Sequence, residues 1–225
     1  MSVCYVSADL CGFRASILEE DGSPDFGLAL GTVYTLKVIS LQVAPTQDAG
    51  DNTTFRDACG EIYYTRSVPA TSTGATLTLT LARYELETIA GLTGAEVITG
   101  PGSLPGYSLG TDTPAATEVH IWTKAFQDGG ATRVASPNEW YHVVYPNVVW
   151  TAGSKTFQSD PLNYVLTGTA TTNGNIGTGA FGDIPTITND PYEIAFLDDT
   201  IPDPDEAPYN SESDVCGMID TPASA

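Results

Sequence analysis

The sequence predicts a mainly β protein: a β-sandwich or barrel-like domain with one short flanking α-helix. Segments that alternate apolar and polar residues recur along the chain, which is typical of strands with one buried face. Thirty of the 225 residues are threonine, whose branched side chain favours strands. The apolar fraction of 41% is ordinary for a globular core, and the length suits one large all-β domain.

The clearest strand signals lie in the first half of the chain. Residues 32–43 form a long run rich in β-branched residues, and residues 76–81 alternate threonine with leucine. The leucine face of 76–81 must be buried, while its threonine face can meet water or a partner. Other strands are expected at 117–126, 139–145, 147–151 and 164–172 and, more weakly, at 3–7, 13–18 and 61–66.

The segment 117–126 has two different faces. Val119 and Ile121 lie on one side of the predicted strand, and His120 and Trp122 lie on the other. An apolar face paired with a mixed one is expected where a sheet buries one side.

One helix and several interruptions are expected between the strands. Residues 82–90 place Ala82, Leu86, Ile89 and Ala90 on one helical face, and Gly91 is expected to end the helix. Pro146 marks an edge or a bend between two strands. Residues 44–60 and 99–116 have no clear period, and loops this long are usually functional or disordered.

The chain is strongly acidic, and the imbalance grows toward the C-terminus. Eight Lys and Arg against 28 Asp and Glu give a formal net charge of −20, and no basic residue follows Lys155. The acidic, proline-rich segment after Leu197 cannot bury enough apolar surface to become ordered. We therefore expect a β domain over residues 1–197 and an acidic extension over 198–225. Its prolines do not suit a calcium loop built on Asp203, Asp205 and Glu206.

This charge also limits the partners that the protein can bind. Capture of phosphate needs Lys and Arg, so the acidic surface disfavours nucleic acids and anionic lipids. No apolar run approaches the ~20 residues of a membrane helix, and the first residues do not resemble a secretory signal. We expect a chain that is made in the cytosol and binds no membrane.

The cysteines do not indicate a metal site. Cys4, Cys11, Cys59 and Cys216 have no closely spaced pair of the kind that zinc sites use. In a reducing cytosol they are expected to be small buried apolar residues. No metal ion and no other cofactor is expected.

Three patterns resemble catalytic motifs but lack the required context. Residues 106–110 match GxSxG around Ser108, yet flanking prolines prevent the strand and helix of a nucleophile elbow. Residues 177–182 match GxGxxG, but no helix follows them. The acids of 19–21 or 85–87 could be imagined as a glycosidase pair, but neither set is expected to converge. We therefore expect no catalytic residues and no enzymatic activity.

Aromatic residues leave a binding function as the alternative. Trp122, Trp140 and Trp150 could form a platform for sugars, although aromatic residues at this spacing more often belong to a core. A virion decoration protein or a carbohydrate-binding β-sandwich module is therefore the alternative function, and it predicts Trp122 or Trp140 at the surface.

Two segments resemble a known family. The strand-to-helix run 77–94 (LTLTLARYELETIAGLTG), the late strand 164–173 (YVLTGTATTN) and the chain length resemble bacteriophage major tail proteins, the tail tube proteins of siphovirus-type phages. The resemblance covers about residues 33–194. It implies a structural subunit with a β-sandwich or barrel-like fold and a flanking helix. Six copies would form a ring, and rings would stack into a tube through whose lumen DNA passes.

The resemblance also implies a location and partners. The chain would lie in the virion tail after assembly in the host cytoplasm, and it would contact copies of itself and the tape-measure, tail-terminator and tail-tip proteins. DNA would pass without specific binding, because an acidic lumen repels phosphate.

The resemblance further implies that the segment 44–60 reaches the adjacent ring, although a mobile solvent loop is the alternative interpretation. The segment combines an aromatic residue with both charges, as docking segments often do. The candidates for ring stacking are Asp48, Asp51, Phe55, Arg56 and Asp57.

Overall fold

The structure is a computed structural model, which describes residues 5–23, 32–35, 38–56, 59–81, 86–99, 105–110, 114–128, 133–153, 164–179 and 183–199. Most of the predicted extension, including Asp203, Asp205 and Glu206, lies outside the described residues. The elements are β1 (Tyr5–Ile17), β2 (Thr32–Thr35), β3 (Val38–Asp48), β4 (Asn52–Arg56), β5 (Ile62–Ser67), β6 (Thr71–Leu81), α1 (Leu86–Thr93), β7 (Glu96–Thr99), β8 (Pro105–Ser108), β9 (Ala116–Asp128), β10 (Arg133–Ala152), β11 (Tyr164–Ala170) and β12 (Ile194–Asp198). The predicted mainly β class with one short helix is thus confirmed for the described part of the chain. No helix in this described part is long and apolar enough to cross a membrane.

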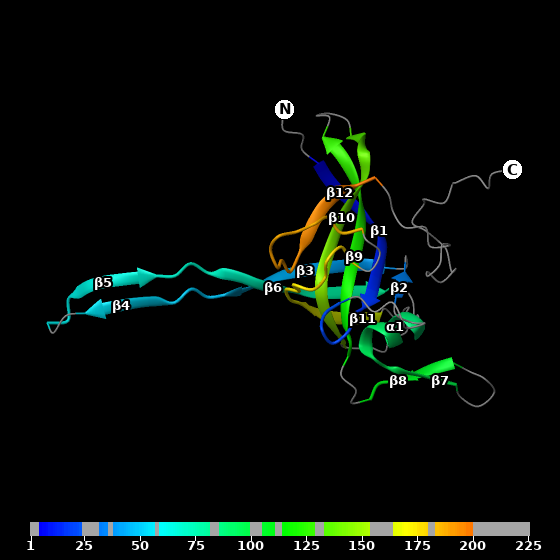
Figure 1. Ribbon diagram of the computed structural model, residues 1–225, viewed down its shortest axis with the longest axis horizontal. Coiled ribbons are helices and arrows are strands. Elements are labelled where there is room, and N and C mark those ends of the chain that lie inside the picture. The colour runs from blue at the N-terminus through cyan, green and yellow to red at the C-terminus, as the bar shows by residue number, and fades with distance from the viewer. Residues whose placement is uncertain are drawn as a thin grey trace, which may run out of the picture.

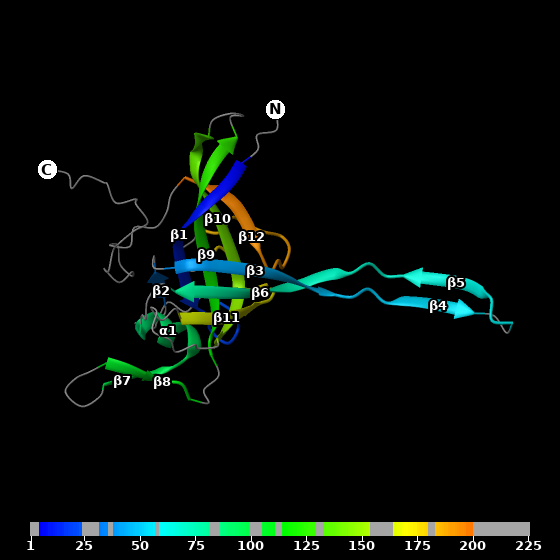
Figure 2. The same ribbon diagram turned by 180° about the vertical axis from the view of Figure 1, so that it is seen from behind.

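One antiparallel sheet of eight strands forms the body of the molecule. Its order is β2-β1-β9-β10-β11-β6-β3, and β12 pairs with β10. The long strand β10 pairs with β9 along one edge, while β12 and then β11 pair along the other. Figures 1 and 2 show β3, β6 and β11 running across β1, β9 and β10, so the sheet folds over on itself into two layers. In the described residues it does not close into a barrel, because β2 and β3 are its ends.

The main hydrophobic core lies between these layers. From Ala75 to Leu81, β6 buries every second residue and leaves the intervening threonines half-exposed, as the alternation of 76–81 predicts. Val119 and Ile121 enter the same core from β9. Gly168 of β11 is needed here, because a Cβ atom would lie 2.7 Å from Val148 Cγ1. Other members of this core are Phe13, Ala15, Ala75, Leu77, Leu79, Leu81, Ile89, Leu92, Tyr145, Val148, Trp150, Tyr164, Leu166 and Ala170.

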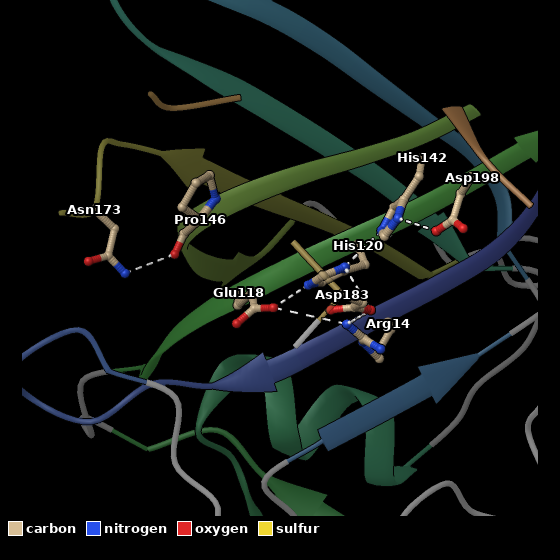
Figure 3. A network of polar contacts seen from close by, with 8 residues as sticks. All are labelled: Arg14, Glu118, His120, His142, Pro146, Asn173, Asp183 and Asp198. Atoms are coloured by element: carbon tan, nitrogen blue, oxygen red, sulfur yellow. Dashed lines mark hydrogen bonds and ion pairs between the residues drawn. The ribbon is translucent and has the colours of Figure 1, made fainter. Parts of the chain in front are cut away.

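The opposite face of β1, β9 and β10 is buried as well. It is covered by residues 171–179 and 183–193, which we call the covering segment, and β12 continues from this segment to pair with β10. Asn173 holds this segment in place: its Nδ2 donates to the carbonyls of Gly22 at 2.8 Å and Pro146 at 3.1 Å (Figure 3). Ile176 and Ile184 of the covering segment and Ile194 of β12 form a second apolar cluster with Leu18 and Val144.

Two local predictions need correction. The helix was expected over 82–90, but α1 runs through Gly91 to Thr93, and residues 82–85 lie outside the described residues. The fully buried Leu92 explains the longer helix, and Gly94, with φ of 67°, follows its end. The stretch 99–116 is not wholly irregular, because β8 pairs with β7 in a hairpin.

Pro146 bends a strand without ending it. The two strands that were expected on either side belong to the single strand β10, and the pairing with β9 is irregular between Tyr145 and Val148. Pro146 therefore marks a bulge, the position within a sheet where proline is tolerated.

We expect Leu79→Ala to lower the free energy of unfolding by about 2–5 kcal/mol, because it opens a cavity at a fully buried position of the main core. Thr78→Ala, one position away on the half-exposed face of β6, is the matched control and should cost less than about 1 kcal/mol. Urea unfolding followed by tryptophan fluorescence measures both values. Equal losses for the two variants would contradict the assigned faces of β6.

Candidate functional site

A two-stranded arm extends far from the body (Figures 1 and 2). We define the arm as residues 45–73; it continues β3 and β6 and ends in the hairpin of β4 and β5. The expectation of an irregular loop over 44–60 is therefore wrong, since most of this segment is strand. At about 3.3 Å per residue, the strand path from Pro45 to Arg56 spans roughly 40 Å.

The part of β3 in the arm and β4 were not predicted because the sequence there contains Pro45 and Gly50. Pro45 fits in β3 because this strand is at the edge of the sheet. Gly50 lies between β3 and β4, where a Cβ atom would be 1.6 Å from the carbonyl oxygen of Val68. Proline and glycine usually indicate loops in a sequence, but in this structure both residues lie within the continuous two-stranded arm.

The arm is exposed along its length. Every described side chain from 45 to 73 is exposed, apart from the partly buried position of Gly50. Near the tip, the rings of Phe55 and Tyr64 stack with their centroids 6.1 Å apart. These two residues and Ile62 are 52%, 54% and 59% exposed, respectively. Phe55 pairs with Tyr64 across β4 and β5, so these two side chains share a face, whereas the register shifts by one residue before Ile62 pairs with Arg56. We call the three exposed side chains of Phe55, Ile62 and Tyr64 the tip patch.

The structure separates the predicted ring-stacking residues. Phe55 and Arg56 lie near the tip, where Arg56 Nη1 donates to the carbonyl of Gly60 at 2.8 Å. Asp48 pairs with Thr71, nearer the body, and the Asp51 carbonyl accepts from the Val68 amide at 3.2 Å. Asp57 lies outside the described residues. The sequence analysis missed Ile62 and Tyr64, although their spacing within the weakly predicted strand 61–66 was an available signal.

An apolar cavity of about 330 Å³ lies at the base of the arm. It is lined by the start of β3 and by β1, β9 and β10. The residues that line it include Leu10, Leu41, Val43, Tyr141, Val143 and Tyr145. The body thus has an apolar recess beside the point where the arm leaves it.

The second feature is a cluster of charged and polar side chains beneath the covering segment (Figure 3). Strand register brings its members together. Arg14 of β1 is directly opposite His120 of β9, and His142 of β10 is opposite Trp122, one diagonal step from His120. Arg14, Glu118, His120 and His142 are all 0% exposed. The sequence placed His120 on the second face of its strand, but it did not show that this face is buried.

Four of these groups form a chain of contacts. Glu118 Oε1 contacts His120 Nε2, and His120 Nδ1 lies 2.8 Å from His142 Nε2. His142 Nδ1 lies 3.1 Å from Asp198 Oδ2. The indole of Trp122 stacks on both imidazoles, with centroid distances of 5.6 Å to His120 and 4.3 Å to His142.

Arg14 provides the positive charge of the cluster. Its Nη2 donates to Asp183 Oδ2 at 2.7 Å and lies 4.0 Å from Glu118 Oε1. Its guanidinium also lies 5.3 Å above the Trp122 ring. Asp183 belongs to the covering segment, so this ion pair ties the segment to β1.

Burial keeps both histidines neutral. Desolvation, together with Arg14, lowers the pKa of His120 well below 6.5. Desolvation and the neighbouring His120 lower the pKa of His142 to about 3, although Asp183 and Asp198 act in the opposite direction. Two neutral imidazoles carry one N–H each, whereas the chain from Glu118 to Asp198 contains three contacts. With both carboxylates ionised, one of the three contacts therefore has no hydrogen.

The remaining motifs do not converge on a catalytic site. Ser108 has an exposed side chain in the β7–β8 hairpin. Gly177 and Gly179, from the GxGxxG pattern, have positive φ. A Cβ atom on Gly179 would lie 2.8 Å from Glu118 Oε1. The absence of a side chain at Gly179 therefore lets the covering segment approach the cluster. In the turn 19–21, the Asp21 carboxylate accepts from Ser23, which lowers the Asp21 pKa. Glu85 lies outside the described residues.

The exposure of the tryptophan and cysteine side chains tests the predictions made for them. Trp122, Trp140 and Trp150 are at most 2% exposed, which removes the proposed sugar platform. Cys11 is buried as predicted, whereas the prediction is wrong for Cys59, which is exposed on the arm. Cys4 and Cys216 lie outside the described residues.

Comparison with known proteins adds little. No protein-family model matches the chain, and no curated protein matches its sequence. Among solved structures, it is similar to a chain in the cryo-EM structure of an extracellular contractile injection system, the PVC sheath-tube complex in its extended state. The TM-score is 0.36 at 14% identity, with coverage of 70% of this chain and 83% of the other. A likeness this weak does not indicate a function.

We expect Arg14→Met to destabilise the protein by about 3–5 kcal/mol, because it removes the cation beside the fully buried carboxylate of Glu118 and the partly buried carboxylate of Asp183. Lys124→Met removes a positive charge from an exposed position of β9 and should change stability by less than about 0.5 kcal/mol. Urea unfolding at pH 7 compares the two. An Arg14→Met protein as stable as the parent would show that the ion pairs of Arg14 contribute nothing to the free energy of unfolding.

Proposed function

We propose that this chain is a non-catalytic structural subunit that assembles with copies of itself into a tube, as the tail tube of a siphovirus-type phage does. In this proposal the subunits form rings, the rings stack, and the arm reaches from one ring to the next. The observation that carries the proposal is the arm with its exposed tip patch.

The arm needs a partner to be stable. An isolated two-stranded ribbon is at best marginally stable in water, and this one has no body residues packed on its described side chains. Both of its outer edges offer backbone groups for pairing. The apolar tip patch of Phe55, Ile62 and Tyr64 is the kind of anchor that buries in a partner's surface.

Charge favours a second copy of the chain as that partner. Residues 45–73 contain Arg56 and Arg66 and four acids, a net charge of 2 − 4 = −2, whereas the whole chain carries −20. The two arginines of the arm can form ion pairs with the acidic surface of a second copy. The apolar cavity at the base of the arm offers a recess on the second copy for the aromatic residues of the tip.

The overall charge fits a conduit for DNA. A surface with 28 acids and eight bases repels phosphate, so a duplex inside such a tube would slide without binding. The tape-measure, tail-terminator and tail-tip proteins are the partners that this function requires. The location follows from the same function: the virion tail, after assembly in the host cytoplasm.

Replacing the tip patch should block assembly. We expect the parent chain to form rings or tubes at high concentration, and the double variant Phe55→Ser, Tyr64→Ser to associate roughly tenfold more weakly or worse, because it lacks the apolar anchor. Val149→Ser, which alters an exposed apolar residue of the body sheet, is the control and should assemble normally. Sedimentation velocity and negative-stain electron microscopy measure the outcome. A parent chain that stays monomeric up to millimolar concentration would exclude the proposed function.

Salt should promote assembly. Subunits of charge −20 repel one another, so raising ionic strength from about 0.01 M to about 0.15 M, which shortens the screening length from roughly 30 Å to 8 Å, should shift the equilibrium toward assemblies. Light scattering at fixed protein concentration follows this change. Assemblies that dissolve as salt is added would show that attraction between opposite charges, and not the apolar patch, dominates the interface.

A further inference from the structure

We propose that His120, His142 and Asp183 bind one divalent transition-metal ion, such as Zn²⁺, which joins the body sheet to the covering segment. His120 Nδ1, His142 Nε2 and a carboxylate oxygen of Asp183 lie within 4.8 Å of one another. Two imidazoles and one carboxylate form a ligand set that zinc accepts, with a fourth position left for water. This site does not depend on the proposed assembly.

The inner nitrogens of the two imidazoles are arranged as ligands. The outer nitrogen of each ring faces a carboxylate: His120 Nε2 contacts Glu118, and His142 Nδ1 contacts Asp198 (Figure 3). When both outer N–H groups donate to these carboxylates, the inner nitrogens, 2.8 Å apart, present lone pairs to each other. A cation between them removes this repulsion. Metal-bound histidines usually donate their other N–H to a carboxylate, and both histidines have one in place.

The charge of the cluster also favours a divalent cation. Among the described residues of the cluster, ionised Glu118, Asp183 and Asp198 contribute three negative charges and Arg14 contributes one positive charge, so with neutral imidazoles the formal sum of these groups is 1 − 3 = −2. An ion of charge +2 balances this sum in a region where an unbalanced charge is costly. Arg14 holds Asp183 Oδ2, while Asp183 Oδ1 is buried without a hydrogen-bond partner among the described residues.

The distances require only small shifts. Bonds of about 2.0–2.1 Å in a tetrahedral arrangement place ligand atoms about 3.3 Å apart. The two histidine nitrogens, now 2.8 Å apart, would separate slightly, and the Asp183 carboxylate, whose Oδ2 is now 3.8 Å from His120 Nδ1, would move closer to them. Asp183 is 25% exposed, so an ion can enter along its side chain.

The test uses the untagged full-length chain, stripped with EDTA and titrated with Zn²⁺ by calorimetry. We expect one ion per chain, and at least tenfold weaker binding in His142→Gln and in Asp183→Asn. Asp198→Asn, which removes the carboxylate behind His142, should weaken binding about 10–100-fold. Asp190→Asn, an exposed acid-to-amide change in the covering segment, and Cys59→Ser, which removes an exposed thiol, are the controls and should bind as the parent does.

X-ray absorption of the zinc-loaded parent protein provides a readout that needs no variant. The chain contains only two histidines, so scattering from two imidazoles per zinc identifies His120 and His142. Three results would overturn the proposal: no stoichiometric binding by the folded parent, ligation by thiolates or by carboxylates alone, or unchanged affinity in the folded His142→Gln and Asp183→Asn proteins. Circular dichroism establishes that each variant is folded.

Discussion

The body of this protein depends on the burial of both faces of the sheet formed by β1, β9 and β10. One face of β9 supplies Val119 and Ile121 to the main core, as in an ordinary sandwich. The other face presents Glu118 and His120, which burial deprives of water. Such groups must find partners within the chain, because an unpaired buried charge is costly. Arg14 meets this need from β1, and the covering segment contributes Asp183.

The arm is the opposite case within the same sheet. β3 and β6 begin in the body, where β6 buries its leucines, and they continue outward with no described side chain buried. Burial thus falls to zero along one continuous pair of strands. An isolated two-stranded ribbon is at best marginally stable in water, which is why the proposed assembly gives the arm a partner. Among the described residues, the body buries many side chains within the chain, whereas the side chains of the arm remain exposed.

The two proposals concern separate parts of the molecule. The tip patch lies on the arm, whereas the histidine cluster lies under the covering segment of the body. Neither proposal requires the other. Both rest on the same reasoning: an exposed apolar patch or a buried polar atom without a partner among the described residues indicates what the protein binds.

The sequence by itself determined the mainly β class, the buried leucine face of β6 and the two faces of β9, because alternation along a strand is a local property. It also indicated that the tryptophans belong to the core. Tertiary structure alone decided the arm, since Pro45 and Gly50 resemble loop residues until their strand partners are known. It also decided the histidine cluster, whose members are distant in sequence and meet only through strand register and the covering segment. Long-range pairing is what local sequence patterns do not encode.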